Sequence, residues 1–200
     1  MLPRMESSPQ VQEQKLNVRD DLQSLSVEEI VRIAHQNLHP SIVVCLNLKG
    51  DNNLGMIIRT ASLFGMSKVI ILGRRIYDRR TSVGMQNYIP IERISATVGD
   101  HSERLDERVI ISLLDTWSLS HQIVFVEQGG IPLKDMNTSL GAASLPPLFI
   151  LGAEDTGIPV KILEFLPSMR VSIPQTGVGR SYNVSTAFSM VAWEYFREMM

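Results

Sequence analysis

Residues Leu148–Pro159 read LFILGAEDTGIP, and this stretch decides the fold class more than any other. Four apolar residues run without interruption and end at Gly152, as expected for a short strand buried on both faces. A glycine-containing loop follows, and Pro159 stands where the first turn of a helix tolerates proline. A buried strand that leads through a loop into a helix is the repeating unit of a parallel α/β sheet.

The chain after Pro40 alternates in the same way. Apolar spacing predicts helices over Leu54–Ala61, Leu105–Leu113 and Val184–Tyr195, and Gly65 tolerates the positive φ expected where the first of these helices ends. We therefore predict an α/β fold with a mostly parallel sheet and helices on both faces. The other predicted strands are the short apolar runs Ile42–Leu46, Val69–Leu72, Ile123–Val126 and Arg170–Ile173.

The length of 200 residues suits one domain with a short extension. We assign residues 1–40 to an N-terminal extension and residues 41–200 to the domain. Met1–Asp20 is polar and is predicted to be partly disordered. A short helix follows over Ser24–His35, because Ser26 and Glu29 form a capping-box pattern ahead of an apolar face.

Several classes of protein are disfavoured by composition. No apolar run approaches the roughly 20 residues that a membrane helix needs, and the polar N-terminus lacks the apolar core of a signal peptide. We expect an intracellular protein, cytoplasmic in the first instance, with a nuclear or organellar location left open. Cys45 lies in an apolar run and is predicted to be a buried thiol, and no Cys/His cluster has metal-ligand spacing, so no metal is expected.

The net charge of −2 argues against a protein whose whole surface binds polyanions. A local basic patch is compatible with it. Four arginines lie close together in the sequence: Arg74, Arg75, Arg79 and Arg80. Such a cluster is equally compatible with a nucleic-acid contact and with an ordinary solvent-exposed surface.

A first polar segment, NNLGMIIRTA, joins the strand Ile42–Leu46 to the next helix. Asn52 or Asn53 suits the cap of that helix, since an Asn side chain satisfies free amides there. Arg59 falls at the edge of the buried face, where a guanidinium must reach water or find an anion. A structural ion pair and a phosphate contact are equally compatible with this position.

The second polar segment is the loop after Leu151. Ligands of open α/β sheets bind at the carboxyl ends of strands, and Gly152 and Gly157 permit close backbone approach there. The segment is neither a P-loop nor a dinucleotide fingerprint. Glu154 is compatible with a functional carboxylate and with a cap of the helix that follows it.

The third polar segment reads VSIPQTGVGRSYNVS from Val171 to Ser185. Ser181 or Asn183 suits the N-cap of the last helix. A simple cap leaves unexplained why Arg180, Ser181 and Asn183 gather at one helix N-terminus, which is a natural anion site.

Taken in this order, the three segments resemble the motifs of the SpoU/TrmH family within the SPOUT superfamily of RNA methyltransferases. The first is similar to the family's Asn-x-Gly-x-x-x-Arg-Thr block, with Asn53, Gly55, Arg59 and Thr60 in register. The second, LGAEDTG, is similar to its Leu-Gly-x-Glu-x-x-Gly block, and the third to its Ile-Pro block with the following Ser-x-Asn-Val-Ser. The similarity runs from Ile42 to Phe196.

The resemblance implies a SPOUT fold, in which the C-terminal part is threaded into a deep trefoil knot. It implies S-adenosylmethionine as cofactor, a ribose 2′-hydroxyl of tRNA or rRNA as methyl acceptor, and a homodimer in which Arg59 approaches the partner's cofactor. The sequence specifies neither the RNA nor the nucleotide. Carried over by position, the catalytic residues are Asn53, Arg59, Glu154, Ser181 and Asn183, and the cofactor-binding residues are Gln128, Gly152, Ile173, Ser181 and Tyr182.

The sequence leaves two other interpretations of the protein's function open. One is a non-catalytic RNA- or partner-binding module that keeps the fold. The other is a Rossmann-type methyltransferase or dehydrogenase, although the expected glycine-rich first turn is replaced by Asn52-Asn53-Leu54-Gly55. For the homodimer we expect contact through the C-terminal helix, because Trp193 lies off its main apolar face.

Overall fold

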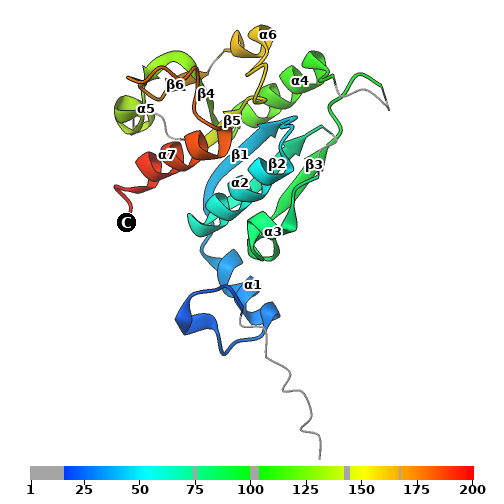
Figure 1. Ribbon diagram of the computed structural model, residues 1–200, viewed down its shortest axis with the longest axis vertical. Coiled ribbons are helices and arrows are strands. Elements are labelled where there is room, and N and C mark those ends of the chain that lie inside the picture. The colour runs from blue at the N-terminus through cyan, green and yellow to red at the C-terminus, as the bar shows by residue number, and fades with distance from the viewer. Residues whose placement is uncertain (1–15, 74–75, 100–103, 142–144, 167) are drawn as a thin grey trace, which may run out of the picture.

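The computed structural model describes residues 16–73, 76–99, 104–141, 145–166 and 168–200. Within these residues six strands form one sheet, and every neighbouring pair of strands is parallel. The predicted α/β class with a mostly parallel sheet is confirmed (Figure 1). The strands are β1 (His39–Leu46), β2 (Met66–Leu72), β3 (Ile91–Ile94), β4 (Gln122–Pro132), β5 (Pro147–Leu151) and β6 (Met169–Ser172).

The strand order is β3-β2-β1-β5-β4-β6. Dinucleotide-binding Rossmann domains have the order 3-2-1-4-5-6, so here β4 and β5 have exchanged places. Strand β5 is therefore central and pairs with both β1 and β4. This order removes the basis for a Rossmann-type interpretation of the chain.

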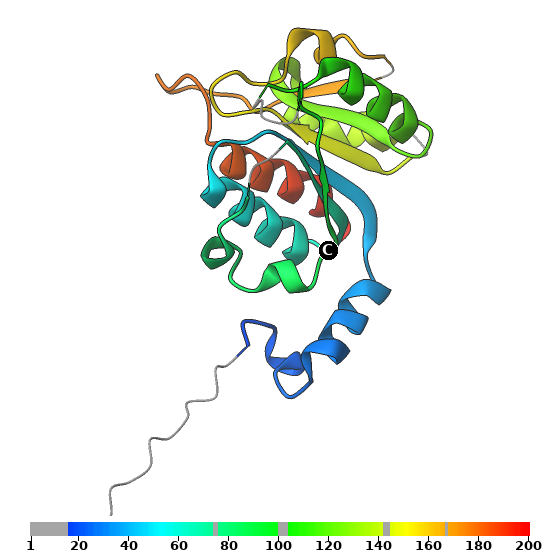
Figure 2. The ribbon, with the colours of Figure 1, turned by 90° about the vertical axis from the view of Figure 1, so that its right-hand side faces the viewer.

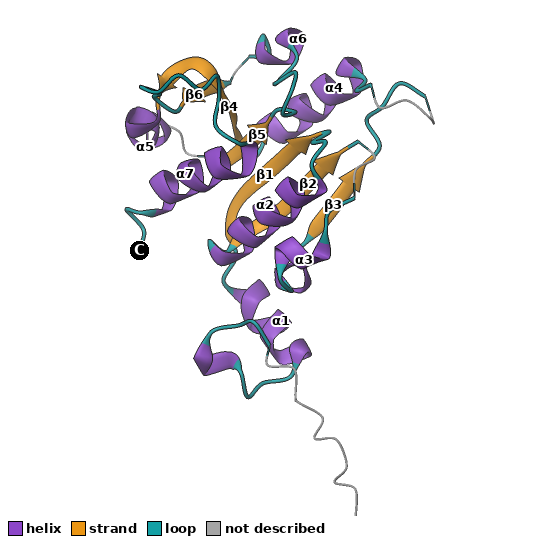
Figure 3. Ribbon diagram, viewed as in Figure 1, coloured by secondary structure: helices purple, strands orange, loops and turns teal. Residues whose placement is uncertain are grey.

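Helices cover both faces of the sheet, as predicted (Figures 2 and 3). One face carries α2 (Asp51–Leu63), α5 (Met136–Gly141) and α7 (Val184–Phe196), and the other carries α4 (Glu107–Ser118) and α6 (Val160–Leu163). The remaining helical elements are α1 (Val27–Gln36), α3 (Arg79–Ser82) and the 3-10 turns Asp20–Leu22, Met85–Asn87 and Leu133–Asp135.

Strand β1 shows why these strands read as continuous apolar runs. Successive side chains of a strand point to opposite faces of its sheet. Val43 and Cys45 accordingly join the core under α2 and α7, whereas Val44 and Leu46 join the core under α4. All four are fully buried, so no position in this part of the strand is free to be polar.

The predicted core face of α2 is confirmed. Leu54, Ile57, Ile58 and Ala61 are all fully buried. The helix gives way to strand β2 through Gly65, whose φ of 65° is the left-handed value expected there.

The helix predicted over Leu105–Leu113 is observed as α4, but the apolar spacing of Leu105, Val109, Ser112 and Leu113 predicted the wrong buried face. Leu105 precedes the helix and forms an isolated bridge with Thr97, and Val109 is exposed. Ile110 and Leu114 are the buried residues instead. The run from Val109 to Leu114 reads VIISLL, so apolar spacing alone does not choose which side of the helix faces the sheet.

The N-terminal extension is attached to the domain through α1. The predicted capping box is confirmed, with Ser26 Oγ accepting from the Glu29 amide while the Glu29 carboxylate accepts from the Ser26 amide. Ile30 packs against Met85 and Tyr88. Strand β1 begins at His39, so the boundary assigned at residue 40 falls inside a strand.

The disorder predicted for Met1–Asp20 mostly lies outside the described residues, which begin at residue 16. Among the helices that the structure describes, none combines the length and apolar character required to cross a bilayer.

Strand β3 and helix α3 were not predicted from the sequence. β3 reads IERI and forms one edge of the sheet, where its charged residues stay exposed. α3 packs closely on α2, and Gly55 is the point of contact. A Cβ at Gly55 would overlap Thr81 Oγ1 and lie 2.7 Å from the Asp78 carbonyl oxygen.

Because of this contact, we expect Gly55→Ala to lower the stability of the protein, although the same change in an open helix raises it. At an open helix position the change stabilises by about 1 kcal/mol, because alanine is the better helix former. At Gly55 we expect a loss of about 1 to 3 kcal/mol, since the methyl group must displace α3. Urea denaturation measures it, with Gly141→Ala in α5 as control, because a Cβ there meets nothing within 4 Å. Equal effects at the two sites would contradict the prediction.

Candidate active site

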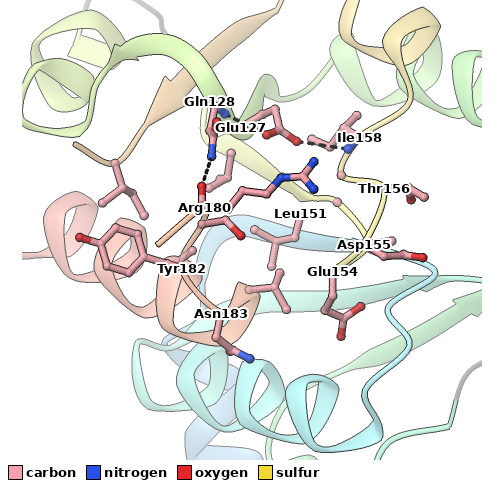
Figure 4. Close-up of a pocket in the computed structure, with 18 of the residues that line it drawn as sticks. Glu127, Gln128, Leu151, Glu154, Asp155, Thr156, Ile158, Arg180, Tyr182 and Asn183 are labelled. Atoms are coloured by element: carbon pink, nitrogen blue, oxygen red, sulfur yellow. Dashed lines mark hydrogen bonds between the residues drawn. The ribbon is translucent and has the colours of Figure 1, made fainter. Parts of the chain in front are cut away.

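A pocket of about 720 Å³ opens at the carboxyl ends of β5 and β6 and beside the middle of β4 (Figure 4). Its walls come from three segments: residues Val126–Gln128 within β4, the loop Gly152–Gly157 after β5 and the stretch Ile173–Asn183 after β6. The carboxyl ends of parallel strands meet at one edge of a sheet, which is where ligands of open α/β folds bind.

A break in the register of β4 forms the first wall. Val126 and Ile131 both pair with Val171 of β6, so four residues of β4 between them have no partner in the ladder. Gln128 was predicted at the carboxyl end of a strand that stops at Val126. It lies instead within a longer strand, and the bulge directs it into the pocket. Gly130 makes the bulge fit, because a Cβ there would overlap the Arg170 carbonyl group.

The second wall is a tight turn held by its own backbone. The amides and carbonyls of Ala153 and Gly157 exchange two hydrogen bonds, of 3.2 and 2.8 Å. A Cβ on Gly152 would overlap Gly157 and lie 2.6 Å from the Ile158 nitrogen. The Ile158 amide donates to Glu127 Oε2 at 3.2 Å, which ties the turn to the bulge in β4. Both glycines are therefore required by the turn itself.

Glu154 extends from this turn to the start of α2. Its carboxylate accepts from the backbone amides of Lys49 at 2.8 Å and Gly50 at 3.0 Å, and from Asn53 Nδ2 at 2.7 Å. The alternative that Glu154 caps the helix following it is wrong, because α6 begins at Val160 after the N-cap Pro159 and has no side-chain cap. Glu154 instead binds the two residues that lead into α2, about 100 positions earlier in the chain, and the side chain of Asn53 in the first turn of that helix.

The interpretation of Asn52 or Asn53 as the cap of α2 is also wrong. The N-cap is Gly50, which has no side chain to offer, and Asn53 lies within the first turn. Its amide group contacts Glu154 on one side and accepts from Asn183 Nδ2 at 3.0 Å on the other. Asn53 thus joins the second and third walls of the site.

Asn183 closes this chain of polar contacts. It is the N-cap of α7, as one of the two predicted candidates, and its Oδ1 accepts from the amides of Ser185 at 3.0 Å and Thr186 at 3.4 Å. The side chains of Glu154, Asn53 and Asn183 therefore link the starts of two neighbouring helices through one connected set of hydrogen bonds.

The same contacts set the charge of Glu154. Partial burial raises the pKa of this carboxyl, but hydrogen bonds from Asn53 and from the amides of Lys49 and Gly50 lower it more. The net pKa lies below the ordinary value, so Glu154 is an anion at neutral pH. Asp155 beside it pairs with Lys49 Nζ at 2.6 Å, and this contact lowers its pKa.

The structure gathers most of the residues predicted for the site. The five positions assigned to the cofactor all line the pocket, and so do the catalytic positions Glu154, Ser181 and Asn183. Asn53 reaches it through its two hydrogen bonds. The cofactor positions are Gln128, Gly152, Ile173, Ser181 and Tyr182.

Arg59 is the exception. It does not line the pocket, and it lies six residues beyond Asn53, about 9 Å along the axis of α2. The side chain is half-exposed and forms no hydrogen bond or ion pair with any described residue. The structural ion pair that the sequence left open is therefore absent among the residues described.

Two charged residues of the pocket were missed by sequence reasoning, Glu127 and Arg170. Both lie in or beside strands whose apolar pattern gave no functional signal. Predicted basic residues Arg74 and Arg75 fall outside the described residues, and Arg80 pairs with Asp78 at 2.8 Å. Nowhere in the described chain do three or more His, Cys, Asp or Glu side chains group as a metal site would require.

A parallel α/β domain with a polar pocket at the carboxyl edge of its sheet defines a class of ligand-binding and catalytic proteins. Comparison with known families narrows this class. Residues 40–193 match the SpoU rRNA Methylase family, and the chain belongs to that family.

Individual relatives are distant. The mouse (Mus musculus) tRNA (guanosine(18)-2′-O)-methyltransferase TARBP1 is 26% identical over 166 residues, which cover 80% of this chain and 9% of the mouse protein. The AdoMet-bound rRNA methyltransferase from Sinorhizobium meliloti superposes with a TM-score of 0.64 at 23% identity, over 85% of this chain and 60% of that one. The A. aeolicus TrmH/SpoU tRNA modifying enzyme superposes with a TM-score of 0.67 at 19% sequence identity, over 86% of this chain and 83% of that one. The chain spans 9% to 59% of the matched curated relatives.

The contacts of Glu154 predict how stability depends on pH. Because its folded pKa is lowered, the carboxylate stabilises the protein above the ordinary value of 4.5, and this contribution is lost as pH falls through the folded pKa. Glu154→Gln should unfold more readily at pH 7, by about 1 to 3 kcal/mol, since its amide sets a donor against backbone donors. Denaturation at a series of pH values should show the gap to wild type narrowing on acidification.

Glu164→Gln is the control for that series, because Glu164 is an exposed carboxyl that forms no side-chain hydrogen bond or ion pair with any described residue. It should leave the stability curve close to that of the wild type. A gap for Glu154→Gln that stays constant across the pH range would contradict the assigned role of its charge.

Proposed function

We propose that this protein transfers a methyl group from S-adenosylmethionine to a ribose 2′-hydroxyl of tRNA or rRNA. The observation that carries the proposal is that the second and third motif segments line one pocket, while Asn53 of the first segment is joined to them by its contacts with Glu154 and Asn183. The relatives support it, since one is a tRNA (guanosine(18)-2′-O)-methyltransferase and one similar structure is an AdoMet-bound rRNA methyltransferase.

The residues of the pocket suit this cofactor. Its volume falls in the range of small-molecule sites. Leu151, Ile158 and Ile173 offer an apolar surface for an adenine ring, and the carboxylates of Glu127 and Glu154 favour a cationic ligand. We assign Gln128, Gly152, Ile173, Ser181 and Tyr182 to cofactor binding, within the trefoil knot that the family leads us to expect.

When bound, S-adenosylmethionine supplies an electrophilic methyl group. A ribose hydroxyl is a weak nucleophile and must be oriented and relieved of its proton. Arg59 is unsuited to accept that proton, because the pKa of an arginine exceeds about 12. We assign to Arg59 the binding of the adjacent RNA phosphate and the polarisation of the 2′-oxygen, with the proton leaving to phosphate or water.

The polar network would hold the remaining groups in place. Glu154 fixes the amide of Asn53, and Asn53 in turn fixes Asn183 at the start of α7. Ser181 lies two residues before this cap and lines the pocket, so its position follows from the same contacts. In this proposal Asn53 orients the ribose or the arginine, while Ser181 and Asn183 shape the space shared by nucleophile and cofactor.

The position of Arg59 supports a homodimer. It lies outside the pocket, so in this proposal a second copy of the chain supplies the arginine that completes the site. The surface around it is apolar: Met56 and Leu63 are exposed on α2, and Trp193 is 57% exposed on α7, which packs beside α2. The main apolar face of α7 is used by the core, so Trp193 remains for a partner.

A non-catalytic module with the same fold is the competing function. Such a module would keep the pocket and the RNA contact and would transfer no methyl group. The complete set of Asn53, Arg59, Glu154, Ser181 and Asn183 favours the enzyme, because a binding module has no need for all five.

Arg59→Ala tests the catalytic proposal. We expect methyl transfer from labelled cofactor to bulk tRNA and rRNA to fall by about 10²-fold to 10³-fold, as when a transition-state donor is removed. Cofactor affinity, measured by calorimetry, should largely survive. Arg59→Lys should also fail, because an ammonium cannot reproduce the planar fork of a guanidinium.

Arg32→Ala on the exposed side of α1 is the matched control and should leave transfer unchanged. Melting curves for each variant separate lost chemistry from lost folding. A stable Arg59→Ala protein with near-normal turnover would defeat the mechanism. If the folded wild type bound no S-adenosylmethionine with or without RNA, the non-catalytic module would be the better account.

Mixed dimers test whether Arg59 acts across the subunit interface. Arg59→Ala and Glu154→Gln subunits carrying different affinity tags are produced together, and the heterodimer is isolated. Neither parent homodimer should transfer methyl groups, whereas the heterodimer should regain activity, because one of its two sites combines an intact Arg59 with an intact Glu154. An inactive heterodimer, or a monomeric mass by light scattering at micromolar concentration, would contradict the prediction.

A further inference from the structure

The charged side chains that line the pocket differ in whether they form hydrogen bonds or ion pairs within the protein. Glu127 accepts from the amides of Ile158 and Gln128, and Glu154 accepts three hydrogen bonds, from the amides of Lys49 and Gly50 and from Asn53 Nδ2. Asp155 pairs with Lys49. The acidic side of the pocket is thus already engaged with the protein, and the two arginines that line it are the charged groups without such contacts among the described residues.

Arg180 combines a fixed backbone with a free guanidinium. Its carbonyl oxygen accepts from Gln128 Nε2 at 2.7 Å, which ties the third wall of the pocket to the bulge in β4. Its guanidinium forms no hydrogen bond or ion pair with any residue that the structure describes. Figure 4 shows the side chain directed into the pocket, across the space between Glu127 and Glu154.

Arg170 is placed differently. It is half-buried on β6, and its Nη1 lies 3.9 Å from the position of a Cβ built on Gly129, so its side chain runs along the bulge in β4. Arg180 stands next to Ser181 and three residues before the cap of α7. It is therefore the arginine beside the polar network of the site.

We propose that Arg180 binds the carboxylate of the amino-acid part of the cofactor. This inference rests on the proposed function. At neutral pH the cofactor carries a sulfonium, an ammonium and a carboxylate, and the acidic residues of the pocket suit only the two cations. A guanidinium offers two parallel N–H donors that match a carboxylate, and the exposed side chain of Arg180 has these donors open to a ligand in the pocket. The inward direction of Arg180 favours a ligand inside the pocket over an RNA phosphate at the surface.

Two ligands that differ only in the carboxylate test this assignment. Calorimetry compares S-adenosylhomocysteine with its decarboxylated analogue on the full-length wild type and on Arg180→Ala. We expect the wild type to bind S-adenosylhomocysteine about 10-fold to 100-fold more tightly than the analogue, as for hydrogen bonds to a charged group. Arg180→Ala should lose this preference and bind both ligands as weakly as the wild type binds the analogue.

Arg80→Ala removes a guanidinium that is paired with Asp78 outside the pocket, and it should bind both ligands like the wild type. Arg180→Lys keeps the charge without the fork and should recover part of the preference. Unchanged binding of S-adenosylhomocysteine by Arg180→Ala would overturn the inference, as would equal weakening of both ligands. A folded wild type that bound neither ligand would overturn the proposed function itself.

Discussion

The site depends on one carboxylate that joins two segments far apart in the sequence. Glu154 accepts from the backbone amides of Lys49 and Gly50, the two residues that lead into α2, and from the side chain of Asn53 in the first turn of the helix. The loop that carries Glu154 and the entry to α2, 104 positions apart, therefore cannot be displaced independently. An ionised carboxylate only accepts hydrogen bonds, so Asn53 must turn its NH₂ group toward it.

That orientation propagates to the third segment. With its NH₂ group on Glu154, Asn53 presents its oxygen to Asn183, which must then donate. The oxygen of Asn183 is left facing the free amides at the start of α7, where a cap is needed. A single charge thus fixes two amide orientations and the entry of α7, together with the residues just before it that line the pocket. A glutamine at position 154 would no longer fix the orientation of the Asn53 and Asn183 amide groups, because its side chain offers a donor as well as an acceptor.

The pocket itself arises from an interruption in regular structure. Four residues of β4 leave the ladder, and the glycines at positions 129 and 130 let the chain pass close to β6. This bulge places Glu127 and Gln128 at the pocket. There Glu127 accepts a hydrogen bond from the Ile158 amide, and Gln128 donates one to the carbonyl oxygen of Arg180. The extension lies at the other end: α1 leads into the amino end of β1, away from the pocket (Figure 1).

The sequence by itself determined the fold class, most of the buried residues and the identity of the three segments that form the site. Runs such as Ile42–Leu46 must be buried on both faces, and a parallel sheet is the arrangement that does this. Only the tertiary structure decided which groups meet. The partner of Glu154, the bulge in β4 and the separation of Arg59 from its own pocket all depend on contacts between distant positions. Local patterns carry no information about such contacts, which is also why the continuous apolar run of α4 was assigned the wrong face.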